Sequence, residues 1–309
     1  MFSSLLPELL GRIVLLASVD GSGRTAAALR LTSRYVAAVV EPYRFCSMAV
    51  EGADRIQSLA SAIRDADLQT KSHYRHLLMS DVTKDFRTTL EGLGAPASGN
   101  GIFRSAGEAA TSSMRDLLAL IAPTLVTFIL LSYNSSCELQ NSVFSADFAQ
   151  LRHFSAHING AARREYPAFG INFPMLLSLH VSAGLSMNSE ALVSNISAPS
   201  LFAIRLGELQ LKVSSMLLAY SILGALLPLY SGRIAMSPDA FPNLKLLVVQ
   251  LFSAEESLEQ CYGFTEDMRS WAAYIEDETN RRLEVLVDAP RVTSMTLREE
   301  WTDLLGEYT

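Results

Sequence analysis

Two pairs of histidines are spaced closely enough in the sequence to be candidate metal ligands. His153 and His157 are four residues apart, and on a helix that spacing places two imidazoles on one metal-binding face. Both residues, however, lie in a segment with the apolar pattern of a strand or at its end. His73 and His76 also come before a predicted strand and have no cysteine nearby. Neither pair predicts a metal site.

The usual catalytic signatures do not occur in the chain. It contains no G-x-S-x-G, no G-x-x-x-x-G-K-S/T and no H-E-x-x-H. The glycine-rich turn at Gly21–Arg24 follows a predicted helix rather than a strand, so it lacks the setting of a phosphate cradle. We therefore predict no enzyme activity and no cofactor. The alternative is an enzyme whose site is assembled from distant residues, which requires a deep pocket with convergent polar groups.

Charge and cysteine content narrow the classes of partner. The chain has 309 residues, 49% of them hydrophobic, with 25 Lys and Arg against 32 Asp and Glu and a net charge of -7. No basic block concentrates a positive field, so nucleic acid is not a predicted partner. Cys46, Cys137 and Cys261 form no CxxC pair, which fits a reducing compartment, the cytoplasm or the nucleus. Apolar stretches at 117–131 and 216–230 are shorter than the roughly 20 residues that span a bilayer, so no membrane partner is predicted.

A repeat organises the elements that would position a site. Five segments approximate the frame P-x-L-x-x-L-x-L, with steps of 26, 25, 25 and 43 residues between their lead leucines, and a sixth leucine follows 39 residues later. The lead leucines are Leu125, Leu151, Leu176, Leu201, Leu244 and Leu283. Each segment has the alternation of a short strand, and stretches with helical periodicity lie between them. Units of about 25 residues cannot bury their own apolar faces, so neighbours are expected to stack side by side.

This pattern resembles the leucine-rich repeat over roughly residues 70 to 290. The family signature L-x-x-L-x-L-x-x-N/C-x-L is half kept, because only Asn159 among five repeats matches its N/C position. The resemblance implies an α/β fold, an irregular solenoid with parallel strands on the concave face and helices outside. A general α/β domain whose strands begin with Pro-x-Leu is the alternative. The glycine-rich segment 92–107 is predicted to be an inserted loop.

The first 45 residues have a different character and form a predicted helical module. Two helical patterns are separated by Asp20–Gly23, and the second, residues 24–40, stops before Pro42. The segment resembles the F-box, which reads approximately L-P-x-E-L-L-x-x-I and then L-x-L-V-S-R-x-(aromatic)-x-x-L-(v)-x-P. The sequence departs from that motif at Leu6, where the family has its first proline, with Pro7 one place later. The layout is similar to that of F-box proteins abundant in mushroom-forming fungi.

The resemblance implies that residues 1–45 bind the Skp adaptor of a cullin ubiquitin ligase, and that residues 46–309 hold a protein substrate for degradation. The residues it assigns to adaptor binding are Leu5, Pro7, Glu8, Leu9, Leu10, Ile13, Leu29, Leu31, Tyr35, Val39 and Pro42. Two alternatives remain open. The helices could instead cap the open end of the solenoid, and the repeats could be a protein-binding scaffold with no ligase role.

Alternation along the strands predicts where a substrate would bind. Positions between the inward leucines are expected to point to an open concave surface. They are Thr127, Ile129, His153, Ser155, Ser178, His180, Arg205, Leu246 and Val248, with Ala203 beside them. This mixture of polar and apolar side chains suits a protein surface better than a phosphate.

Overall fold

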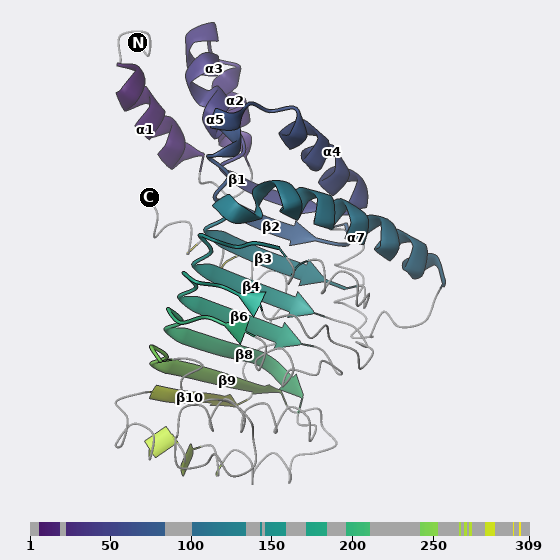
Figure 1. Ribbon diagram of the computed structural model, residues 1–309, viewed down its shortest axis with the longest axis vertical. Coiled ribbons are helices and arrows are strands. Elements are labelled where there is room, and N and C mark those ends of the chain that lie inside the picture. Colours follow the sequence, from purple (N-terminus) through teal and green to yellow (C-terminus); the bar gives the residue numbers. More distant parts are fainter. Residues whose placement is uncertain are drawn as a thin grey trace.

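The chain has an α/β fold built on one long parallel sheet (Figure 1). The computed structural model describes residues 6–18, 23–83, 101–133, 143, 146–158, 171–183, 196–210, 242–252, 266, 269–270, 272–273, 282–287, 299 and 303. Eight strands pair in the order β1-β2-β3-β4-β6-β8-β9-β10, so each strand of this sheet lies beside the next one in the sequence. The predicted α/β class with parallel strands is confirmed.

The strands of the main sheet are short and begin at similar points of the repeat. Their bounds are β1 Ser47–Glu51, β2 His76–Ser80, β3 Thr127–Ser132, β4 His153–Ile158, β6 Ser178–Ala183, β8 Ala203–Gln210, β9 Leu246–Phe252 and β10 Arg282–Val287. A separate two-stranded sheet joins β5, Ile171–Asn172, to β7, Ile196–Ser197, also in parallel. The long steps of the repeat do not interrupt the main sheet, because β9 pairs with both β8 and β10.

Five of the six lead leucines turn inward just before their strands. The amide of Leu151 donates to the carbonyl of Phe148 at 3.4 Å, and the amide of Leu176 donates to that of Phe173 at 3.3 Å. In each of these five repeats the strand begins two residues after the leucine, and its alternate side chains join the same core. The sixth, Leu283, is also buried but lies inside β10, where it pairs with Leu247 of β9. The repeated leucine therefore marks the start of β3, β4, β6, β8 and β9 because it anchors the preceding turn.

One apolar cluster runs along one face of the sheet. Aromatic rings stack through it, with 5.4 Å between the ring centroids of Phe128 and Phe154 and 5.7 Å between those of Phe154 and Phe173. At the β1 end, helix α4, Ala53–Arg64, and helix α7, Gly101–Ile121, cover the sheet (Figure 1). The short helix α5, Leu68–Lys71, and the 3-10 turns η2, Glu41–Tyr43, and η3, Ala122–Thr124, complete this end.

The predicted inserted loop is wrong over its last part. Helix α7 begins at Gly101, so residues 101–107 are helical, whereas 92–100 lie outside the described residues. The helix continues into a buried stripe that includes Met114, Leu117 and Ile121. Packing of that stripe offsets the roughly 1 kcal/mol that each helical glycine costs relative to alanine. No helix in the described part of the chain combines the length and apolar character needed to cross a membrane.

Candidate interaction sites

The first site lies on three short helices at one end of the strand stack, beyond β1 (Figure 1). They are α1, Pro7–Ala17, α2, Arg24–Arg30, and α3, Arg34–Val40. Pro7 occupies the first turn of α1, where its missing N–H costs nothing, and Glu8 faces the positive end of the helix dipole. The single helix predicted over residues 24–40 is in fact two helices, α2 and α3.

Local side-chain bonds explain the break between α2 and α3. The hydroxyl of Thr32 donates to the carbonyl of Leu29 at 2.7 Å and closes α2. The amide of Val36 then donates to the hydroxyl oxygen of Ser33 at 3.1 Å and opens α3. A serine in extended backbone is a favoured N-cap, so the chain restarts the helix there.

A small core of its own holds this module together. Leu10 and Val14 of α1 pack against Ala26 of α2 and against Val36 and Val40 of α3. Leu10 is only 1% exposed, so its prediction as an adaptor-contact residue is wrong. Its side chain projects from the face of α1 that meets the other two helices.

The other face of α1 carries an exposed apolar stripe. Its members are Leu6, Leu9, Ile13 and Leu16, which are 46% to 64% exposed. Their spacing of three and four residues keeps them on one side of the helix, away from the buried Leu10 and Val14. We call these four residues the α1 stripe. Large apolar side chains grouped in this way mark an interaction surface.

The remaining predicted adaptor residues divide by exposure. Leu31 is 89% exposed in the turn after α2, and Pro7 and Glu8 are also exposed. Partly buried residues of the module are Leu29, Tyr35, Val39 and Pro42. Leu5 lies outside the described residues. The α1 stripe and Leu31 are therefore the parts of this module most open to a partner.

The prediction of an open concave surface is wrong at five of its ten positions, which are buried. Buried positions are Thr127, Ile129, Ser155, His180 and Val248. His153, Ser178, Ala203 and Leu246 are partly exposed, and the side chain of Arg205 lies outside the described part. Alternate strand residues do point to opposite faces, but at β2 and β3 both faces are removed from water. All six residues of β3 are buried, which shows this directly.

Polar groups near the ends of the strands make structural bonds. The Tyr133 amide donates to both carboxylate oxygens of Asp81, at 2.9 and 3.0 Å, and the Ser132 hydroxyl also donates to that carboxylate. His157 Nδ1 and the Ser182 hydroxyl lie 3.1 Å apart across neighbouring strands. These bonds satisfy polar groups where the strands end. Among the described residues, no group of three or more His, Cys, Asp or Glu could hold a metal ion.

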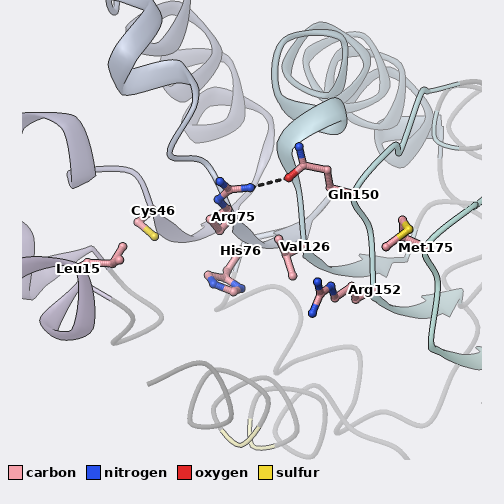
Figure 2. A pocket seen from close by; sticks show the side chains of 8 residues that line it. All are labelled: Leu15, Cys46, Arg75, His76, Val126, Gln150, Arg152 and Met175. Carbon is pink, nitrogen blue, oxygen red and sulfur yellow. Dashed lines mark hydrogen bonds between the residues drawn. The ribbon is translucent and has the colours of Figure 1, made fainter. Parts of the chain in front are cut away.

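The second site is a pocket of about 440 Å³ between α1 and the start of the strands (Figure 2). The residues that line it are Leu15, Cys46, Arg75, His76, Val126, Gln150, Arg152 and Met175. The Arg75 Nη1 group donates to Gln150 Oε1 at 2.6 Å, which fixes that guanidinium at the pocket wall. Two arginines, Arg75 and Arg152, therefore line the same cavity.

Burial keeps the other titratable groups of the pocket uncharged at neutral pH. Desolvation, with smaller contributions from Arg75 and His153, lowers the pKa of His76 to about 4. Desolvation likewise raises the pKa of the Cys46 thiol to about 11, against an opposing effect of Arg75. The positive charge of the pocket therefore comes from its two arginines.

Sequence reasoning missed these pocket residues although the repeat contains a signal for them. Val126 and Arg152 each follow a lead leucine directly, at the variable fourth position of the P-x-L-x frame. The structure places this position immediately before each strand, at the amino-terminal edge of the sheet. Reading this column across repeats would have found a row of surface side chains.

A scan against protein-family models matched none of them, and searches of curated proteins and of solved structures also found no match to this chain. The comparisons therefore add neither a family nor a relative with a similar fold. Two features of the described residues bear on function, the α1 stripe and the pocket with two arginines.

Proposed function

We propose that this chain is the substrate-recognition subunit of a Skp-cullin-F-box type ubiquitin ligase. In this proposal α1, α2 and α3 form an F-box that binds the Skp adaptor. The parallel strands belong to an irregular leucine-rich-repeat solenoid that holds a protein substrate. The observation that carries the proposal is the α1 stripe, four large apolar side chains left exposed on a helix whose other face is already packed.

Physical chemistry favours a protein partner on this stripe. A surface helix of an isolated domain normally has one apolar face, and α1 has apolar side chains on two. Burying a Leu or Ile side chain fully is worth about 1.5–3 kcal/mol, so a half-exposed one would gain roughly 1 kcal/mol on contact. Four such side chains and Leu31 would supply an apolar centre for an interface.

The arrangement of strands supports the repeat part of the proposal. Neighbouring strands of the main sheet follow one another in the sequence, as stacked repeats require. Their first five lead leucines recur at one buried position despite the long step of 43 residues, whereas Leu283 lies in register with Leu247 inside β9. Under this proposal the chain needs no catalytic group, because holding a substrate near the ligase supplies the rate gain by proximity.

The test is co-purification of the full chain with a Skp adaptor. The disrupting variant is Leu9→Asp combined with Ile13→Asp, which places two charges on the α1 stripe without touching the module core. Leu177→Asp is the control, because Leu177 is also exposed, at 40%, but lies immediately before β6 and outside the helical module. Circular dichroism and unfolding midpoints check that all three proteins are folded.

We expect wild type and Leu177→Asp to retain the adaptor and the double variant to lose it. Retention by the folded double variant would contradict the assignment of the α1 stripe. No retention by the wild-type chain would contradict the ligase role and favour a repeat scaffold without one.

A further inference from the structure

The pocket between α1 and the strands has an unbalanced positive charge. Arg75 and Arg152 line it, and no carboxylate is among its lining residues. In the part of the chain that the structure describes, the ion pairs join other residues, such as Arg44 with Glu41 and Arg282 with Glu284. A chain of net charge -7 thus has two arginines and no carboxylate among the residues that line this pocket. This is the charge arrangement of an anion site.

Recognition in the pocket falls to side chains, because the nearby backbone donors are used. The amides of Arg152 and His153 both donate to the Val126 carbonyl, at 2.8 and 3.1 Å. The amides of Val126 and Thr127 donate in the same way to the Arg75 carbonyl. The bond to Gln150 uses one of the five N–H donors of Arg75. A guanidinium presents its donors in a planar fork that matches a carboxylate or a phosphate.

An exposed apolar surface continues from the pocket along the sheet edge. Met175, Leu177 and Phe202 are 46%, 40% and 49% exposed, and Met175 itself lines the pocket. Leu177 and Phe202 stand immediately before β6 and β8, as Arg152 stands before β4. Adjacent strands lie about 4.8 Å apart, so Arg152 and Phe202 start roughly 10 Å from each other. An extended peptide covers that distance in about three residues.

We propose that this edge binds an extended peptide through an anionic side chain placed between Arg75 and Arg152. Apolar side chains two or three residues away would pack on Met175, Leu177 and Phe202. A carboxylate or a phosphate would satisfy the same guanidinium groups. The role of this edge as the binding site for a ligase substrate rests on the proposed function. Peptide binding itself does not, because it is measured without the adaptor.

The experiment uses three fluorescein-labelled nonapeptides that differ at one central residue. Each has the sequence Gly-Leu-Leu-Ser-X-Ser-Leu-Leu-Gly, where X is phosphoserine, glutamate or serine. Fluorescence anisotropy measures their binding to the full-length chain and to the variants Arg75→Gln and Arg152→Gln. Arg115→Gln is the matched control, because it removes the same charge from an exposed position on α7.

We expect at least one anionic peptide to bind about tenfold or more tightly than the serine peptide, and either pocket variant to lose about tenfold. Binding of the phosphoserine peptide alone identifies phosphate as the preferred group, whereas equal binding of the glutamate peptide identifies a carboxylate site. Equal affinity for all three peptides, unchanged affinity in folded Arg152→Gln, or no binding at all would overturn the inference.

The two proposals fail separately. Arg152→Gln is expected to retain the Skp adaptor, since Arg152 lies outside the α1 stripe. If the anionic peptides bind but the adaptor does not, the peptide site stands without a ligase role. If the adaptor binds and the peptides do not, the ligase proposal stands and its substrate docks elsewhere.

Discussion

Leu9 and Leu10 are neighbours on α1 with opposite environments. Leu9 is 49% exposed, whereas Leu10 is 1% exposed against α2 and α3. Sequence reasoning placed both residues in the adaptor contact, because α1 is apolar on two faces and its pattern does not tell which one is covered. Only the position of the neighbouring helices shows which of the two leucines is buried and which stays exposed.

This difference predicts opposite results for two adjacent alanine variants. Leu10→Ala is expected to destabilise the module by about 2–5 kcal/mol, because it leaves a cavity in the small core. Leu9→Ala is expected to change the free energy of unfolding by less than about 0.5 kcal/mol. Urea unfolding followed by circular dichroism measures both. Equal destabilisation by the two variants would contradict the packing of α1.

Burial of His76 makes the stability of the folded chain sensitive to acid. Its pKa falls from 6.5 to about 4 in the folded chain, mainly because the side chain is only 5% exposed and loses its hydration. The His76 imidazole is therefore protonated below about pH 6.5 in the unfolded chain but only below about pH 4 in the folded chain. Stability is lost as pH falls through this window, by up to about 3 kcal/mol.

The variant His76→Gln is expected to lose less stability than wild type when the pH is lowered from 7 to 4.5. The difference is expected to be about 2 kcal/mol. Urea midpoints at the two pH values measure it, and the carboxylates that also titrate are common to both proteins. Identical losses in wild type and variant would mean that His76 is not the acid-sensitive group.

At the scale of elements, the repeat frame distinguishes the inward leucine from the residue that follows it. Leu176 is fully buried before β6, while Leu177 is 40% exposed at the sheet edge. We expect Leu176→Ala to cost about 2–5 kcal/mol and Leu177→Ala less than about 0.5 kcal/mol. Thermal unfolding of the two variants compares them. A larger effect at Leu177 would contradict the assigned register.

The strands were predictable because their signal is local and repeated. A leucine that anchors a turn and an alternating run of six residues specify where each strand begins, so the sequence predicted strands near Thr127, His153 and Ser178. The start of α7 at Gly101 was not predictable in this way. Its glycines favour a loop locally, and the tertiary packing of Met114 and Leu117 outweighs that preference.

At the scale of the whole molecule, the order of the strands followed from the repeat but the burial of the second sheet face did not. Small polar residues and histidines on that face, such as Ser155 and His180, have the composition of an accessible surface. The structure nevertheless buries them. Burial of this kind depends on segments distant in sequence, so no local pattern reports it. The pocket depends in the same way on α1 meeting the sheet edge.

Two exposed surfaces of the described residues differ in chemistry. The α1 stripe is apolar, whereas the pocket and the edge beside it combine two arginines with Met175, Leu177 and Phe202. Because of this difference, we expect a different partner on each surface.

Isothermal titration of the full chain with a purified Skp adaptor tests the proposed interaction of the α1 stripe. We expect saturable binding with one adaptor per chain, weakened about tenfold or more by Ile13→Ala and unchanged by Leu177→Ala. Absence of binding by the folded wild-type chain, or equal affinity of wild type and Ile13→Ala, would contradict it.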